Sequence, residues 1–221
     1  MKSTFPFTCS CGYQGNVETT GTQDPKDFQC PSCGAPFWFV PPLGNVVGTR
    51  IWGRASAELQ NSDFTLAIVL SAIAVECELA RLYFKWRHVD VLDTRTPTQA
   101  DRDAWSEQWN KWTRIAVRFN KASELMVGKK FDSFLLLNPG PIKKLEAKYP
   151  DVVAGASPKE FFVSGLFHKR NRVVHDGEID FGQDVAEKCV TLAATLFEIL
   201  DAMDKERLKA LDAKHKAHLK T

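Results

Sequence analysis

The sequence has no hydrophobic run long enough to cross a bilayer and no pattern typical of a signal peptide. Its longest nearly apolar run, Phe64 to Val75, spans about 12 residues, whereas a membrane helix needs about 20. Asp63 and Glu76 bound this run, as expected of a buried helix in a soluble protein. We therefore expect a cytoplasmic protein with reduced thiols and no contact with a membrane.

The sequence also has no large excess of charge of one sign. Its net charge is +2, so there is no global field typical of nucleic-acid binding, and any such surface must be local. Basic residues cluster at 168–172 and again at 205–220, and acidic residues cluster at 176–184. With 221 residues and 44% hydrophobic content, the chain can form one medium domain and a small one.

Cysteine is scarce beyond the N-terminus, where four of the six cysteines lie. Two of them form a Cys-x-Cys pair and two a Cys-x-x-Cys pair, each followed by a glycine that lets the backbone reverse. Four thiolates at such spacing predict a structural, tetrahedral zinc site in a β-type zinc ribbon over residues 1–42. So small a unit needs the metal to fold. The predicted ligands are Cys9, Cys11, Cys30 and Cys33.

Two other roles compete for these cysteines. Disulfides would need an oxidising compartment, and a redox pair would need a thioredoxin-like context, and neither is indicated by the sequence. Short β-like runs at 4–8 and 37–40 flank the pairs. Cys77 and Cys189 fall on apolar helix faces and are expected to be core residues.

The rest of the chain predicts a mainly α protein, an α-bundle of four helices. Pro41 and Pro42 end the ribbon, and Ser157 and Glu160 form a capping box at the start of one helix, which ends at Gly177. The fourth helix carries an apolar stripe from Val185 to Met203. We expect a linker at 43–57, a helical domain at 58–215 and a basic tail at 216–221. The predicted helices span 56–88, 98–127, 157–177 and 181–212, with an irregular insertion at about 128–156 that holds a short helix at 141–148.

Two charged residues fall where the helical periodicity predicts apolar ones. Arg170 lies in the middle of the apolar arc of the third helix, and Glu76 lies in the apolar arc of the first. The arc of the third helix is formed by Phe162, Val163, Leu166, Phe167, Val173 and Val174. A charge at such a position is costly unless it is paired. A bidentate pair of Glu76 with Arg170 is one interpretation, and a Glu76 side chain that extends to solvent at the bundle edge is the other.

The segment Arg170-Asn171-Arg172-Val173-Val174-His175 ends this third helix and precedes Asp176-Gly177. It resembles the Arg-Asn-x-x-x-His signature of the HEPN superfamily, whose four-helix domains include RNA-cutting toxins and antiviral defence nucleases. The resemblance covers roughly residues 60–210 and implies a HEPN-like four-helix bundle preceded by the zinc ribbon. Asn171 and His175 are four residues apart and so share one helical face.

The resemblance implies a metal-independent endoribonuclease that cleaves single-stranded RNA by attack of the substrate's own 2′-hydroxyl. Arg170 would bind the phosphate, Asn171 would orient the phosphate or the histidine, and His175 would act as acid or base. Glu76, His168 and Arg172 would support them. The site would lie at the interface of a homodimer, in a toxin–antitoxin or antiphage setting with an antitoxin or regulatory protein as a further partner.

Two alternatives remain. The domain could be a non-catalytic HEPN-type module that binds RNA or a nucleotide, or the zinc ribbon could make the protein a scaffold for protein contacts. Many toxin members carry a tyrosine two residues after the histidine, where this chain has Gly177, so control by modification at that position is in doubt.

Overall fold

The computed structural model describes residues 3–8, 13–19, 29–34, 43–92, 94–150 and 157–218, without the side chains of 3–8, 16–19, 43–46 and 215–218. The chain divides into two units, Met1–Leu43 and Gly44–Thr221. The protein is mostly helical, as predicted. None of the described helices is long and apolar enough to cross a membrane.

The N-terminal unit contains a two-stranded antiparallel sheet. Strand β1 (Ser3–Thr8) pairs with β2 (Gln14–Thr19), with Phe5 opposite Val17, so the predicted strand at 4–8 is confirmed. A tight turn follows at 30–34, where the Gly34 amide donates to the Cys30 carbonyl at 2.8 Å. Gly34 has a φ of +68°, which glycine adopts without steric cost. The predicted strand at 37–40 lies outside the described residues.

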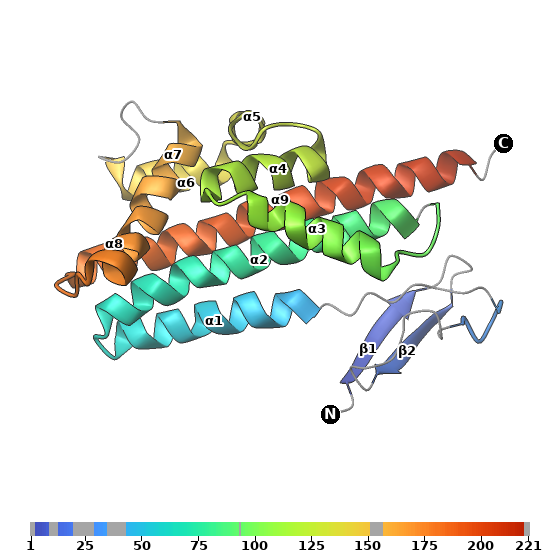
Figure 1. Ribbon diagram of the computed structural model, residues 1–221, viewed down its shortest axis with the longest axis horizontal. Helices are drawn as coiled ribbons and strands as arrows, with labels where there is room; N and C mark the ends of the chain where they lie inside the picture. Colours follow the sequence, from blue (N-terminus) through green and yellow to red (C-terminus); the bar gives the residue numbers. More distant parts are fainter. Residues whose placement is uncertain are drawn as a thin grey trace. The chain divides into compact units, whose positions relative to one another are not determined.

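The helical unit is built around two long helices that lie side by side, α2 (Phe64–Leu92) and α9 (Gln183–His218) (Figure 1). The predicted apolar stripe on α9 is confirmed, because all but one of its members are buried and Val185 is partly buried. The buried members are Cys189, Leu192, Leu196, Ile199, Leu200 and Met203. The helix extends past the predicted end at 212, and residues 216–218, expected in a basic tail, are its last turn.

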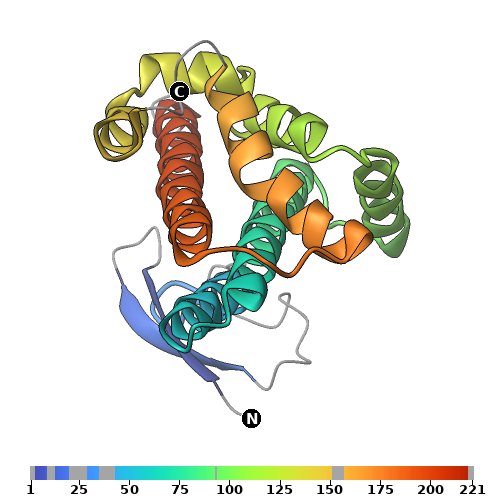
Figure 2. The same cartoon turned by 90° about the vertical axis from the view of Figure 1, so that its left-hand side faces the viewer.

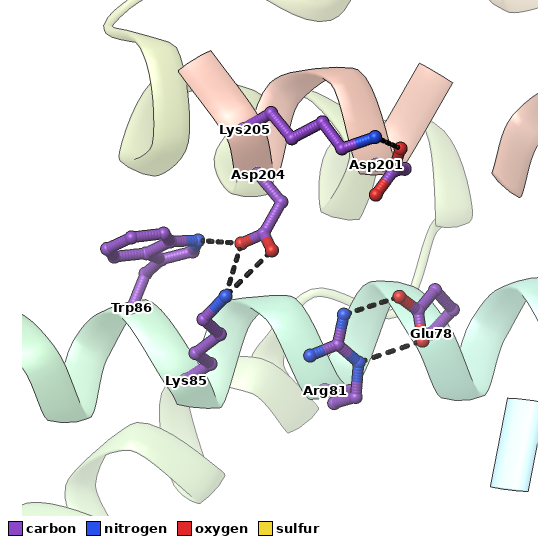
Figure 3. Close-up of polar contacts among 7 residues, drawn as sticks. All are labelled: Glu78, Arg81, Lys85, Trp86, Asp201, Asp204 and Lys205. Atoms are coloured by element: carbon purple, nitrogen blue, oxygen red, sulfur yellow. Dashed lines mark hydrogen bonds and ion pairs between the residues drawn. The ribbon is translucent and has the colours of Figure 1, made fainter. Parts of the chain in front are cut away.

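Polar side chains also join these two helices at the edge of the apolar core (Figure 3). The Asp204 carboxylate on α9 accepts hydrogen bonds from Lys85 Nζ at 2.7 and 2.8 Å and from Trp86 Nε1 at 2.7 Å. Both donors belong to α2, and the Trp86 side chain is fully buried. A charged group that is mostly buried thus has partners for both of its oxygens, as such burial requires.

The prediction of one helix at 56–88, preceded by a linker at 43–57, is wrong in its bounds. Residues 43–60 form a helix of their own, α1 (Leu43–Gln60), and α2 starts only at Phe64. Between them Ser62 has a φ of +64°, and the Asp63 side chain accepts from the Leu66 amide at 3.0 Å. Asparagine, serine and aspartate favour caps and turns, and here they outweigh the apolar periodicity that continues across the break.

The second predicted helix is also two helices, α3 (Gln99–Lys111) and α4 (Ile115–Val127). The break falls at Trp112, whose ring lies edge-on to the Tyr83 ring at 5.3 Å and whose carbonyl accepts from Arg118 Nε at 2.7 Å. Packing of this aromatic ring against α2 therefore overrides the local preference for a continuous helix.

The third predicted helix is present, with a change of winding inside it. It runs as α7 (Pro158–Phe162), a π-helical turn η3 (Val163–Phe167) and α8 (His168–Asp176). Ser157 caps its start by accepting from the Glu160 amide, and Gly177 ends it with a φ of +68°. In Figure 2 this orange segment runs diagonally past α2, and the loop after α8 leads back to α9.

The insertion at 128–156 is more regular than predicted. Helix α6 (Gly140–Lys148) confirms the expected short helix, and α5 (Phe131–Leu137) precedes it. Phe131 is buried and stacks on Phe119 of α4 at 4.8 Å. A seven-residue helix is too short to show periodicity, so its stability comes from this packing.

Candidate functional site

The π-helical turn η3 positions the residues that follow it. Gly165 packs so closely on α9 that a Cβ there would lie 2.7 Å from Leu192 Cδ1. The Cys189 thiol of α9 donates to the Gly165 carbonyl at 3.4 Å. A π turn holds one extra residue, so it rotates everything after it by about 100° relative to an α-helix.

This rotation changes the face that α8 was predicted to bury. Val174, expected in the apolar arc, is 53% exposed, and none of the residues of α8 is buried. Helix α8 therefore offers most of its side chains to solvent or to a partner, and only Lys169, Arg170 and Val173 of this helix are partly buried.

Arg170 contacts Glu76, as predicted, but through one oxygen. Arg170 Nη2 lies 3.4 Å from Glu76 Oε2, and Nη1 donates to Asn171 Oδ1 at 2.9 Å. The two charged side chains are 25% and 26% exposed, so they lie at the edge of the core. Arg170 Nε is buried and has no hydrogen-bond partner in the described part of the chain. The guanidinium is thus fixed on one side by α2 and by its neighbour.

These residues line a cavity of about 500 Å³. Its walls come from α2, from the start of α4 and from the segment α7–α8. Pockets that bind small molecules typically measure about 300–1,000 Å³, so the cavity can accept a ligand of nucleotide size. The lining residues are Glu76, Thr113, Arg114, Ile115, Ala116, Glu160, Val163, Phe167, His168, Arg170 and Asn171.

His175 does not line this cavity. It is exposed in the last turn of α8, one helical turn beyond Asn171 and on the same face. His168, which was expected only to support the site, does line the cavity and is exposed. The structure therefore brings together Arg170, Asn171, Glu76 and His168, and leaves His175 beside them on the open surface.

Arg172 contributes to the structure of the loop after α8. Its guanidinium forms an ion pair with Glu178 and lies 5.7 Å from the centre of the Phe181 ring. The same loop is joined to α2, because Thr65 Oγ1 donates to the Ile179 carbonyl at 2.9 Å. These contacts hold the end of α8, and with it His175, next to the start of α2.

The structure describes half of the predicted zinc site. Cys30 is buried and Cys33 is exposed, and both lie on the tight turn that Gly34 closes. A turn of this kind can direct two thiolates to one metal. Cys9 and Cys11 lie outside the described residues, and within the described ranges no three potential ligands come together.

The two cysteines of the helical unit are unsuited to metal binding or nucleophilic attack. Burial raises the pKa of Cys189 to about 12, partly opposed by Lys169 and Lys188. Burial also raises the pKa of Cys77, and the nearby Glu76 and Glu78 add to the effect. Both thiols therefore stay protonated at neutral pH, whereas ligands and nucleophiles act as thiolates.

The residues that the start of α4 and the turn before it add to the site were not predicted from the sequence. Thr113, Arg114 and Ile115 reach the cavity only because the chain breaks between α3 and α4. The one available signal was length, since a predicted helix of about 30 residues greatly exceeds the mean of about 11–12. Glu160 was recognised as a capping residue, but its place on the cavity wall was not predicted.

No protein-family model, no curated protein and no solved structure matches this chain. Its function is therefore inferred from the cavity, from helix α8 and from the resemblance of the Arg170–His175 segment.

Proposed function

We propose that the protein is a metal-independent endoribonuclease of the HEPN type that cleaves single-stranded RNA. The observation that supports this most is the fixed Arg170 beside Asn171, in contact with Glu76 and facing a cavity of nucleotide size. A guanidinium held in place before the substrate arrives can stabilise the charge that develops on a phosphate without reorganising. His175 follows one turn later on the same helix face.

In the proposed reaction the 2′-oxygen of the substrate attacks the adjacent phosphorus while the bond from phosphorus to the 5′-oxygen breaks. One imidazole takes the proton of the 2′-hydroxyl, and a second, protonated imidazole gives a proton to the leaving 5′-oxygen. Each chain carries one such motif, so we propose a homodimer in which His175 of each protomer supplies one of the two groups. The exposed α8, with Val174 uncovered, is available for this contact.

The zinc ribbon is proposed to be structural. Cys9, Cys11, Cys30 and Cys33 would hold one zinc ion, which would supply folding free energy to the N-terminal unit and no chemistry at the RNA. A toxin–antitoxin or antiphage setting, with an inhibitory protein partner, is part of the same proposal and comes from the resemblance alone.

One observation favours a second function, a module that binds RNA or a nucleotide without cutting it. His175 lies outside the cavity that Arg170 and Asn171 line. In a single protomer, therefore, Arg170 and His175 do not face the same cavity. The cation that would bind the phosphate is separated from the imidazole that would act on it. Cleavage then depends on the dimer, whereas binding does not.

The substitution His175→Ala separates the two functions. Because His175 is exposed at a helix end, we expect the variant to keep its thermal stability while losing RNA cleavage by at least about 100-fold, the usual contribution of a general acid or base. Cleavage of single-stranded RNA is measured by gel electrophoresis and stability by circular dichroism. Full cleavage by His175→Ala would instead favour the binding module.

A further inference from the structure

We infer that the cavity binds one nucleotide of the RNA substrate and selects guanine, with Arg114 on a phosphate and Glu160 on the base. The inference rests on the proposed function for its choice of RNA, and it assigns roles to two residues outside the motif at 170–175. Both residues line the same cavity as Arg170 and Asn171.

Arg114 is an exposed cation on the wall of this cavity. It is the N-cap residue of α4, and within the described part of the chain it has no ion pair or hydrogen bond through its side chain. Arg170 faces the same volume with one side of its guanidinium engaged by Glu76. A phosphate between Arg114 and Arg170 would receive charge-assisted hydrogen bonds, the strong kind that arginine makes to phosphate.

Glu160 supplies the opposite charge without pairing with Arg114. Its carboxylate has no ion-pair partner among the described residues, and it is exposed on the cavity wall. A site that bound only phosphate would gain nothing from an unpaired carboxylate, which repels anions. A nucleotide has both kinds of group, because its phosphate is negative and the edge of its base carries N–H donors.

Guanine fits such a carboxylate better than the other bases. It presents the N1–H and N2–H donors side by side, so both oxygens of one carboxylate can accept at once. Uracil places its single N–H between two carbonyl oxygens, which a carboxylate repels. The buried Phe167 and Val163 and the partly buried Ile115 form an apolar part of the cavity wall. RNA-binding proteins commonly hold a splayed-out base between such walls and polar groups that read its edge.

The experiment is calorimetric titration of the full-length protein with guanosine 5′-monophosphate and with uridine 5′-monophosphate. We expect the guanine nucleotide to bind at least about tenfold more tightly. Arg114→Ala should weaken binding of both nucleotides about tenfold or more, and Glu160→Gln should weaken only the guanine nucleotide. Arg50→Ala and Glu206→Gln remove the same charges from exposed positions on α1 and α9 outside the cavity and should change neither affinity.

Equal affinities for the two nucleotides, or no effect of Arg114→Ala and Glu160→Gln, would overturn the inference. These results are independent of catalysis. If Arg114→Ala and Glu160→Gln both cleave RNA with an unchanged KM, the proposed nucleotide site is overturned and the proposed nuclease function is not. Nucleotide binding with the expected variant effects in a protein that cuts no RNA would support the site and overturn the proposed nuclease.

Discussion

At the scale of single residues, Arg170 is the residue most important for the proposed site. Its guanidinium contacts Glu76 and Asn171 and keeps one buried nitrogen, Nε, without a partner in the described part of the chain. Unsatisfied buried donors are uncommon, and those that occur are often found at functional sites. The contact with Glu76 joins α8 to α2, so the same residue serves the fold and the proposed chemistry.

The Arg170–Glu76 contact predicts a coupled pair. Exposed ion pairs contribute about 0–1 kcal/mol, and breaking a buried pair costs about 3–5 kcal/mol. Because both side chains are about a quarter exposed, we expect a coupling free energy near 1 kcal/mol in a double-mutant cycle of Arg170→Ala and Glu76→Ala. Urea unfolding of the wild type, both single variants and the double variant measures it. Strictly additive losses would show that the two residues do not interact.

At the scale of elements, the long periodic helices could be predicted and their breaks could not. The stripe on α9 and the stop at Gly177 follow from local rules of spacing and capping. The breaks at Ser62 and Trp112 depend on a turn and on a tertiary aromatic contact, which apolar spacing does not report. The π turn at 163–167 contains Gly165, which packs closely on Leu192 of α9, and its extra residue is not visible in apolar spacing. Val174, predicted to lie in the core, is therefore at the surface.

The same limit explains which parts of the site were predictable. Arg170 and Glu76 stood out because a charge in an apolar arc is costly, a property of each residue in its own helix. The cavity forms where α2, the start of α4 and the segment α7–α8 come together. Arg114 lines it because the chain breaks before α4, and this break was not predicted. The spacing of apolar residues within one helix carries no information on contacts between helices.

The contact of α2 with α9 predicts unequal roles for two aspartates of α9 (Figure 3). Asp204 is mostly buried and bonds Lys85 and Trp86 on the other helix, so Asp204→Ala leaves a lysine and an indole N–H without their acceptor. We expect a loss of about 2–3 kcal/mol in the free energy of unfolding. Among the residues that the structure describes, Asp201 pairs only with the exposed Lys205 one turn away, so Asp201→Ala should cost less than about 1 kcal/mol.

Chemical denaturation of the two variants under identical conditions measures this difference. Equal losses would mean that the polar contacts between α2 and α9 contribute no more than an ordinary surface ion pair. Both positions lie on one helix and carry the same substitution, so the difference in helix propensity cancels.

At the scale of the whole molecule, the division into Met1–Leu43 and Gly44–Thr221 predicts independent responses to metal removal. The larger unit has its own apolar core, whereas the smaller has about 40 residues, and we propose that a bound zinc ion supplies its folding free energy. We expect one zinc ion per chain by elemental analysis. Cys30→Ser should abolish zinc binding while the helical circular dichroism and its melting temperature stay within a few degrees of the wild type.

A protein purified without chelators that contains no zinc would contradict this prediction. If the helical signal of Cys30→Ser melted far below that of the wild type, the two units would depend on each other. Cys189→Ser is the matched control, because it removes a buried thiol of the helical unit and should leave zinc binding unchanged.

The most direct test of the proposed nuclease is the chemistry of the RNA ends it produces in the presence of EDTA. If the 2′-hydroxyl is the nucleophile and no metal acts at the phosphate, the 5′ fragment ends in a 2′,3′-cyclic phosphate, detectable by mass spectrometry. A single 2′-deoxynucleotide at the mapped cut site should block cleavage there and leave other sites unaffected. Cleavage that requires added magnesium, or that leaves a 3′-hydroxyl, would contradict the mechanism.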